Sequence, residues 1–365
     1  MNARWLTRAA GVLLAIVALS ALAVARQATA APVRLADTGL YTDGRTESLA
    51  SGVLAYSPQY PLWTDGATKR RWILLPPGAS IDATDPDRWV FPVGTKLWKE
   101  FSFARRVETR YMELRSDGEW TFATYAWSVD GKEATLAPTR GAKGAYTLAD
   151  GTRYDLPSQS DCRACHEAHP TRVLGFGALQ LSPDRDPLAP HATPRTSREV
   201  ELRELVDRGL VRNLPTEHYA DAPRIDARTA RERAALGYLH ANCASCHNAD
   251  GPLASLGMRL EQTLGVPRDA NAALETTLDV IGRWRASDGA GCRRVAPGEP
   301  DASLLVRRIG SREPLMQMPP FGTRRADEQA LELIAAWVRE DLAPASRAAE
   351  ASHRNNPPQV TTKDR

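Results

Sequence analysis

A short run in the last third of the chain reads Asn242-Cys243-Ala244-Ser245-Cys246-His247-Asn248. A C-x-x-C-H motif is typical of covalent attachment of a c-type haem. Two thiols three residues apart on a helical turn can each bond to one vinyl group of the porphyrin, and the imidazole that follows can bind the iron. The run therefore predicts a haem attached to Cys243 and Cys246, with His247 as an axial ligand.

The motif occurs a second time, as Cys162-Arg163-Ala164-Cys165-His166. Four of the five cysteines fall in the two motifs, so a second haem is expected on Cys162 and Cys165, with His166 on its iron. A zinc site built from four thiolates is one alternative, and a thioredoxin-like dithiol is another. Neither explains why a histidine follows both pairs, and no βαβ pattern lies beside either motif, so two haems are the preferred interpretation.

A methionine followed by two prolines, Met318-Pro319-Pro320, lies 71 residues beyond His247. Haem iron held by histidine on one side commonly takes methionine on the other. The prolines restrict the backbone directly after the thioether. We therefore expect Met318 to be the second ligand at this iron, with Met316 as its rival.

The first motif lacks such a loop, because no Met-Pro sequence follows His166 before the second motif begins. A histidine, His191 or His218, is the expected sixth ligand of the first haem. An open sixth position is an alternative, as is ligation by Met112 or Met258, although both methionines suit a core.

Four further residues have competing interpretations. His240 is expected on the surface of the helix that precedes the second motif. Cys292 has no partner left and is expected to be a buried free thiol. Arg293 and Arg294 could pair with haem propionates, since guanidinium suits carboxylate, or could form a solvated face.

The first 30 residues have the pattern of a signal peptide. Arg4 and Arg8 precede an uncharged run over 9–25, and Ala28-Thr29-Ala30 is a cleavage signal. Export to the periplasm is therefore expected, which agrees with haem attachment outside the bacterial cytoplasm. An uncleaved membrane anchor is the alternative, because the run of 17 residues is slightly long for a signal peptide.

The charge of the chain excludes some partners. The formal net charge is +3, from 47 basic and 44 acidic residues. Residues 1–30 hold three arginines and no acids, so cleavage would leave 44 of each. A nearly neutral chain argues against nucleic acid or an anionic membrane as the main partner. Membrane association is expected only if the N-terminal segment stays attached.

Residues 31–157 have the pattern of a β-rich, sandwich-like domain. Runs of aromatic and β-branched residues alternate with turn formers, and a hairpin is expected around residues 116–119. Most of the tryptophans lie here and are expected in the core, with an aromatic platform for a ligand as the alternative: Trp63, Trp72, Trp89, Trp98, Trp120 and Trp127.

The rest of the chain suggests a haem-binding segment over 158–225, an all-α domain over 226–345 and a disordered polar tail over 346–365. The segment 158–225 is broken by prolines, with a helix expected from a capping box at Thr196. The all-α domain is expected to have helices over about 227–242 and 327–342. The fold class is therefore α+β with several domains.

The C-terminal third resembles a class I cytochrome c domain, with a helix leading into residues 243–247, a Met-Pro-Pro loop and a closing helix. The resemblance implies that His247 is the proximal ligand and Met318 the distal one. The loop 248–315 is longer than in minimal members. The whole chain also resembles a group of exported bacterial two-haem proteins, at residues 61–66, 91–95, 242–248 and 317–322. That likeness implies cofactor and location more than reaction.

These observations predict a periplasmic dihaem c-type cytochrome that passes single electrons to an unidentified redox partner protein. One alternative is a haem enzyme with an open first haem, peroxidase-like or a subunit associated with a dehydrogenase. Another is a ligand-binding β domain that uses the haems as a relay. A distal ligand at the first haem favours electron transfer, a vacant polar pocket favours the enzyme, and exposed tryptophans favour the binding domain.

Overall fold

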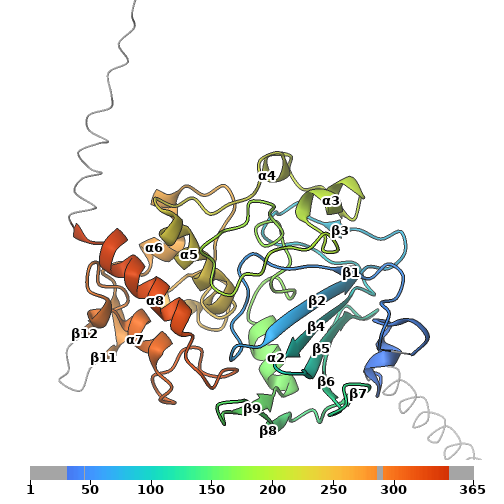
Figure 1. Ribbon diagram of the computed structural model, residues 1–365. Coiled ribbons are helices and arrows are strands. Elements are labelled where there is room, and N and C mark those ends of the chain that lie inside the picture. Colours follow the sequence, from blue (N-terminus) through green and yellow to red (C-terminus); the bar gives the residue numbers. More distant parts are fainter. Residues whose placement is uncertain (1–30, 45, 286–290, 345–365) are drawn as a thin grey trace, which may run out of the picture.

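The computed structural model describes residues 31–44, 46–285 and 291–344. The predicted signal peptide at 1–30 and tail at 346–365 lie outside these residues. A strand-rich region comes first and a helical region follows, as expected for the α+β class (Figure 1). No helix within the described ranges has the length and hydrophobicity needed to cross a membrane.

The strand-rich region is built on one six-stranded antiparallel sheet of order β1-β2-β4-β5-β6-β7. The hairpin expected around residues 116–119 joins β5 to β6. In place of a second large sheet there is a separate hairpin, β8–β9, and a short parallel pair of β3 with β10. The strands are β1 (Leu54–Ala55), β2 (Thr68–Leu74), β3 (Ile81–Asp82), β4 (Lys96–Ser102), β5 (Arg106–Leu114), β6 (Trp120–Trp127), β7 (Ala134–Leu136), β8 (Ala142–Thr147), β9 (Arg153–Leu156) and β10 (Val211–Arg212).

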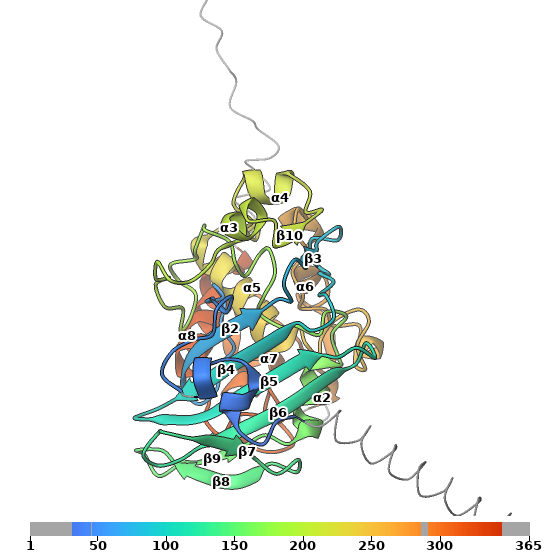
Figure 2. The same ribbon diagram turned by 90° about the vertical axis from the view of Figure 1, so that its right-hand side faces the viewer.

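Successive residues of the sheet point to opposite faces. On the outer face, Trp72, Trp98 and Tyr111 pack against the 3₁₀ helix Leu35–Thr38 and its neighbours. On the inner face, a row of apolar partners packs against the chain that follows the first motif. That apolar row is Ile73, Leu97, Met112 and Phe122. The helical region lies behind the sheet when the sheet faces the viewer (Figure 2).

The tryptophans mostly form the core, as expected. Trp72, Trp89, Trp98 and Trp127 are buried, and the other two of this region, Trp63 and Trp120, are half-buried. The alternative of an exposed aromatic platform therefore has little support.

The segment after the sheet contains short helices. These are α2 (Gln159–His166), α3 (Leu202–Asp207) and α4 (Glu217–Ala220). The prediction of a helix from Thr196 was wrong. Thr196 and Glu199 do make the hydrogen bonds of a capping box, with the Thr196 backbone N–H donating to Glu199 at 2.7 Å, but the chain makes only a turn there. The helix starts six residues later, where buried Leu202 and Leu205 anchor it on the inner face of the sheet.

The helical unit is defined as α5 to α8 with their connections, and it confirms both expected helices. Thr229 caps the start of α5, and Asp327 caps the start of α8. A π-helical turn over Trp337–Asp341 continues α8, and Trp337 is fully buried. The elements are α5 (Ala230–Cys243), α6 (Ala272–Glu275), β11 (Ile281–Arg285), β12 (Gly291–Arg293), α7 (Leu304–Gly310) and α8 (Glu328–Ala336).

The two regions share one core. Tyr60, which lies between β1 and β2, belongs to the same apolar cluster as Leu236, Leu239 and Trp337 of the helical unit. Its ring lies directly on α5, where a Cβ at Gly237 would be only 2.0 Å from its Cε1 atom. Any larger residue at position 237 would displace Tyr60, so glycine in the middle of this helix is required by packing between the regions.

Candidate functional site

The first motif occupies α2, whose start is fixed by a capping box. Ser158 accepts a hydrogen bond from the Asp161 backbone N–H at 3.1 Å, and Asp161 accepts one from the Ser158 backbone N–H at 2.8 Å. Helical spacing then presents Cys162 and Cys165 one turn apart, both half-buried. The helix lies against β6, where the rings of His166 and Phe122 are 5.3 Å apart.

His166 has the environment of a metal-binding histidine. Its Nδ1 atom is 2.6 Å from the carbonyl oxygen of Arg172, so Nδ1 carries the proton and Nε2 keeps its lone pair. Burial lowers the pKa of His166 to about 4, which keeps the ring neutral at pH 7. A neutral imidazole with a fixed tautomer fits the axial ligand that the sequence predicts.

The second motif begins at Cys243, the last residue of α5. The chain turns tightly there, with the backbone N–H groups of Cys246 and His247 both donating to the Cys243 carbonyl at 3.1 and 2.9 Å. The Nδ1 atom of His247 is buried without a hydrogen-bond partner among the described residues. Burial and the nearby guanidinium groups of Arg294 and Arg308 lower the pKa of His247, so this ring is also held in its neutral, ligating form.

The fold brings the two motifs together. The thiols of Cys165 and Cys246 lie close enough to act on each other, which lowers the pKa of Cys246 and raises that of Cys165. Asn248 donates from Nδ2 to the carbonyl of Ala168, just past the first motif, at 3.1 Å. Gly251 also approaches this carbonyl, since a Cβ there would lie 2.6 Å from the oxygen. Nothing in the sequence signals this contact between segments 80 residues apart.

The Met-Pro-Pro loop is tied to α7. The Met318 backbone N–H donates to the Arg308 carbonyl at 2.9 Å, and Arg308 donates from Nε to the Met316 carbonyl at 3.0 Å. Because Arg308 also acts on His247, the loop and this histidine lie in one neighbourhood. Both methionines are half-buried, so the choice of Met318 over Met316 stays a prediction.

Residues 61–66, part of the resemblance noted above, connect the second motif to this loop. The Trp63 backbone N–H donates to Asn242 Oδ1 at 2.7 Å, directly before Cys243. Two residues on, the Oδ1 atom of buried Asp65 accepts the backbone N–H groups of Arg324 and Arg325 at 2.8 and 2.9 Å. This short segment therefore positions the chain on both sides of the predicted second haem site.

Replacing Asp65 with alanine is expected to destabilise the protein by about 2–4 kcal/mol, because two backbone N–H groups would lose their acceptor at a buried site. Asp65→Asn keeps an oxygen at this position and is expected to lose much less. Urea unfolding of the two variants measures the difference. Equal stability of Asp65→Ala and wild type would contradict the role given to this carboxylate.

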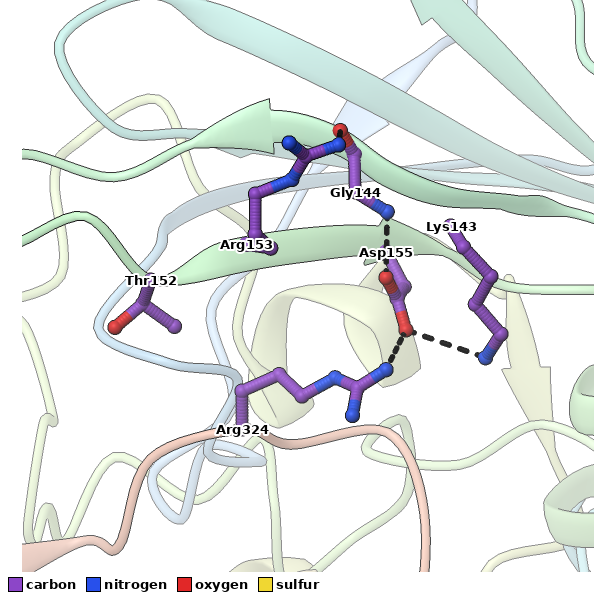
Figure 3. Close-up of a pocket in the computed structure, with 6 residues that line it drawn as sticks. All are labelled: Lys143, Gly144, Thr152, Arg153, Asp155 and Arg324. Carbon is purple, nitrogen blue, oxygen red and sulfur yellow. Dashed lines mark hydrogen bonds and ion pairs between the residues drawn. The ribbon is translucent and has the colours of Figure 1, made fainter.

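An open pocket of about 370 Å³ lies where β8 and β9 meet the chain after the Met-Pro-Pro loop (Figure 3). Asp155 is at its centre and accepts hydrogen bonds from the Gly144 backbone N–H at 2.7 Å and from Lys143 at 3.2 Å, and it is paired with Arg324. None of the predicted site residues lines this pocket. We interpret it as a charged junction that fastens residue 324 to the β region.

Several secondary expectations can now be compared with the structure. His240 is half-buried, not on the surface, because its Nδ1 accepts the Gln262 backbone N–H at 3.1 Å; burial lowers its pKa to about 4. Cys292 is a half-buried free thiol.

Arg294 donates to the carbonyls of residues 256, 257 and 276, and Arg293 pairs with Asp279 at 3.7 Å. Propionates would therefore compete with these partners.

The proposed sixth ligands of the first haem have different surroundings. His191 is 2.8 Å from Asp327 through Nε2 and lies on the ring of Trp63, so it is held at the start of α8. His218 lies beside Gly265. Met112 and Met258 pack in or against apolar cores, as expected. The arrangement gives His191 a structural role and leaves the sixth ligand untested.

The zinc alternative requires at least three suitable side chains around one point. Within the residues that the structure describes, no group of three or more Cys, His, Asp or Glu side chains is arranged to hold a metal ion. Cys165 and Cys246 lie close enough to act on each other, but the described residues form no cluster of four thiols.

The chain was compared with families and with individual proteins. No curated protein and no solved structure matches it. Residues 268–322 match the family Planctomycete cytochrome C (PSCyt1), a range that begins after the second motif and includes α6, α7 and the Met-Pro-Pro loop. The chain therefore contains a cytochrome c domain at residues 268–322, which implies a c-type haem and haem-based electron transfer.

Proposed function

We propose that this protein is an exported cytochrome with two covalent c-type haems, which exchanges single electrons with a redox partner protein. The observation that carries the proposal is the approach of the two attachment motifs, in which Asn248 bonds to the Ala168 carbonyl and Cys246 lies close enough to Cys165 to act on it. A c-type haem supplies an iron that cycles between two oxidation states. The protein sets the ligands, burial and hydrogen bonds that tune its potential.

Cys162 and Cys165 would attach one haem and Cys243 and Cys246 the other. His166 and His247, both neutral, would bind the two irons, and Met318 would complete the second. Each thioether sulfur is bonded to a carbon that is itself bonded to the porphyrin. Two attachment sulfurs near each other would thus hold the two ring edges close together, which suits electron exchange inside the protein.

The location is also part of the proposal. Its support is the signal-like pattern of residues 1–30 together with the need for haem attachment outside the cytoplasm. The near-equal numbers of basic and acidic residues after residue 30 favour a protein partner over nucleic acid.

Intact mass of the denatured protein, combined with iron analysis, tests the haem count. We expect the mass of the chain from residue 31, or from residue 26 if cleavage follows Ala23-Val24-Ala25, plus two haems, and two irons per chain. One haem, or zinc in place of iron, would contradict the proposal. Adding cyanide to the oxidised protein then separates electron transfer from the enzyme alternative, since rapid binding at one iron would reveal an open sixth position.

A further inference from the structure

The inner face of the sheet carries three cations side by side. Arg71 on β2 is the direct partner of Lys99 on β4, and Lys99 is the direct partner of Arg110 on β5. Directly paired residues in antiparallel strands point to the same face, where like charges destabilise the sheet. We call Arg71, Lys99 and Arg110 the cationic row. It lies immediately beside the apolar row that ends at Phe122.

One member of the cationic row is neutralised within the protein. Arg110 donates to the carboxylate of Glu108 at 2.6 Å, and Tyr154 shares that oxygen. Glu108 is fully buried on the same strand. This pair accounts for a single positive charge of the row.

Within the described residues, the other two cations have no ion-pair partner. Arg71 is only 8% exposed, and Lys99 is half-buried with its ammonium 5.2 Å from the ring of Phe101. Neither side chain makes a hydrogen bond or ion pair with any of the residues that the structure describes. Glu199 acts on Arg71, and Glu108 on Lys99, only at longer range. Leaving a charge buried and unpaired costs several kcal/mol. Two such cations side by side therefore indicate a site for anionic groups.

The cationic row faces the first motif. In the neighbouring apolar row, Phe122 touches the ring of His166. Thr124, the partner of Arg110 on β6, lines a small cavity together with Cys162. Both Arg110 and Lys99 are close enough to act on the imidazole of His166.

We propose that Arg71 and Lys99 bind the two propionate carboxylates of the haem attached at Cys162 and Cys165, which rests on the two-haem function proposed above. Neighbouring strands lie about 4.8 Å apart, so the row extends about 10 Å from Arg110, beside Cys162, to Arg71. This is comparable to the breadth of a porphyrin, whose propionates lie on the edge opposite the vinyl groups. Two unpaired cations match two carboxylates, and guanidinium binds carboxylate in a bidentate way.

The variants Arg71→Gln and Lys99→Gln test the assignment. Lys96→Gln is the matched control, because Lys96 lies on the same strand but bonds to the Thr38 carbonyl on the outer face at 3.1 Å. Haems are counted first by mass, and the potential of each haem is then measured by optical titration. We expect both variants to keep two haems and to lower the potential of the first, because a cation near the propionates favours the reduced iron. The second haem and the control are expected to be unchanged.

The melting temperature provides a second measurement. Lys99→Gln is expected to change it in opposite directions in proteins with and without the first haem. In the two-haem protein, Lys99→Gln is expected to lower the melting temperature, because a carboxylate loses its partner. In the variant Cys162→Ala/Cys165→Ala, the same change is expected to raise it, because it removes repulsion within the row. The same sign in both backgrounds would overturn the assignment.

The remaining outcomes separate the possible causes of failure. A single covalent haem would overturn the assignment together with the proposed function. Two haems with unchanged potentials in both Arg71→Gln and Lys99→Gln would overturn the assignment alone. If the potential of the first haem differs between the variants and wild type only when sulfate is present, the cationic row binds a free anion and not a propionate. That result would also overturn the assignment.

Discussion

Met318→Ala is expected to abolish the iron–sulfur charge-transfer absorption while leaving both haems attached. The physical reason is that the thioether would be the second axial ligand, whereas attachment depends on the cysteines. The backbone at Met318 is fixed by its bond to the Arg308 carbonyl, next to the arginine that acts on His247. Because thioether ligation raises the potential of haem iron, that potential is also expected to fall.

Met316→Ala is the matched control, because Met316 is two residues away and equally half-buried. It is expected to keep the absorption, with the Arg308 bond to its backbone carbonyl unaffected by the side chain. If Met316→Ala loses the band and Met318→Ala keeps it, the assignment of the ligand is reversed. If neither loses it, the second iron does not take a methionine from this loop.

Removing the first haem, by the double change Cys162→Ala/Cys165→Ala, is expected to alter the second haem as well. Wild type is expected to reduce in two separate steps, and the variant in a single one-electron step at a lower potential than the same haem has in wild type. The proximity of Cys165 to Cys246 is the reason, since it places the two attachment points near each other. A nearby ferric iron is positively charged and favours reduction of its neighbour.

Cys292→Ala is the control for this change. Cys292 is the fifth cysteine and a free thiol outside both motifs, so its loss is expected to leave both steps in place. A second haem whose potential is the same with and without the first would show that the two sites are electrically independent. The proximity argument would then be wrong, while the haem count would still stand.

The features that were predictable from sequence are those fixed by a few neighbouring residues. The helix before Cys243 and the helix after Asp327 both have a capping side chain and an apolar stripe, and both occur where expected. The β-rich character of the first region follows from alternation within single strands in the same way. Local pattern and local structure agree in these elements because the caps and stripes lie within each element.

The features that were missed depend on contacts between distant segments. His240 has the position of a surface residue on α5, but the loop at Gln262 covers it. Thr196 has the chemistry of a helix start, but the apolar side chains that anchor a helix come six residues later. The partner of His191 in the structure is Asp327, 136 residues away, which its place in the sequence does not indicate. None of these partners is specified by spacing along the chain.

Part of the cationic row could have been recognised from the sequence of its strands. Strands β2, β4 and β5 each place a cation next to an apolar residue on the inner face, as in Arg71 before Ile73, Lys99 after Leu97 and Arg110 before Met112. A charge at a position where alternation predicts burial indicates an unusual site. The cross-strand register that aligns the three charges, however, comes only from the folded sheet.

The packing of Tyr60 against Gly237 has a consequence for modularity. Glycine in a helix interior costs about 1 kcal/mol relative to alanine, and α5 carries this weakness so that a ring from the β region can lie on it. A fragment containing only residues 226–345 would keep the weak point and lose the ring that covers it. The helical unit is therefore not an independent module. A recombination that moved it to another protein would have to bring the segment around Tyr60 as well, which ties the inheritance of the two regions together.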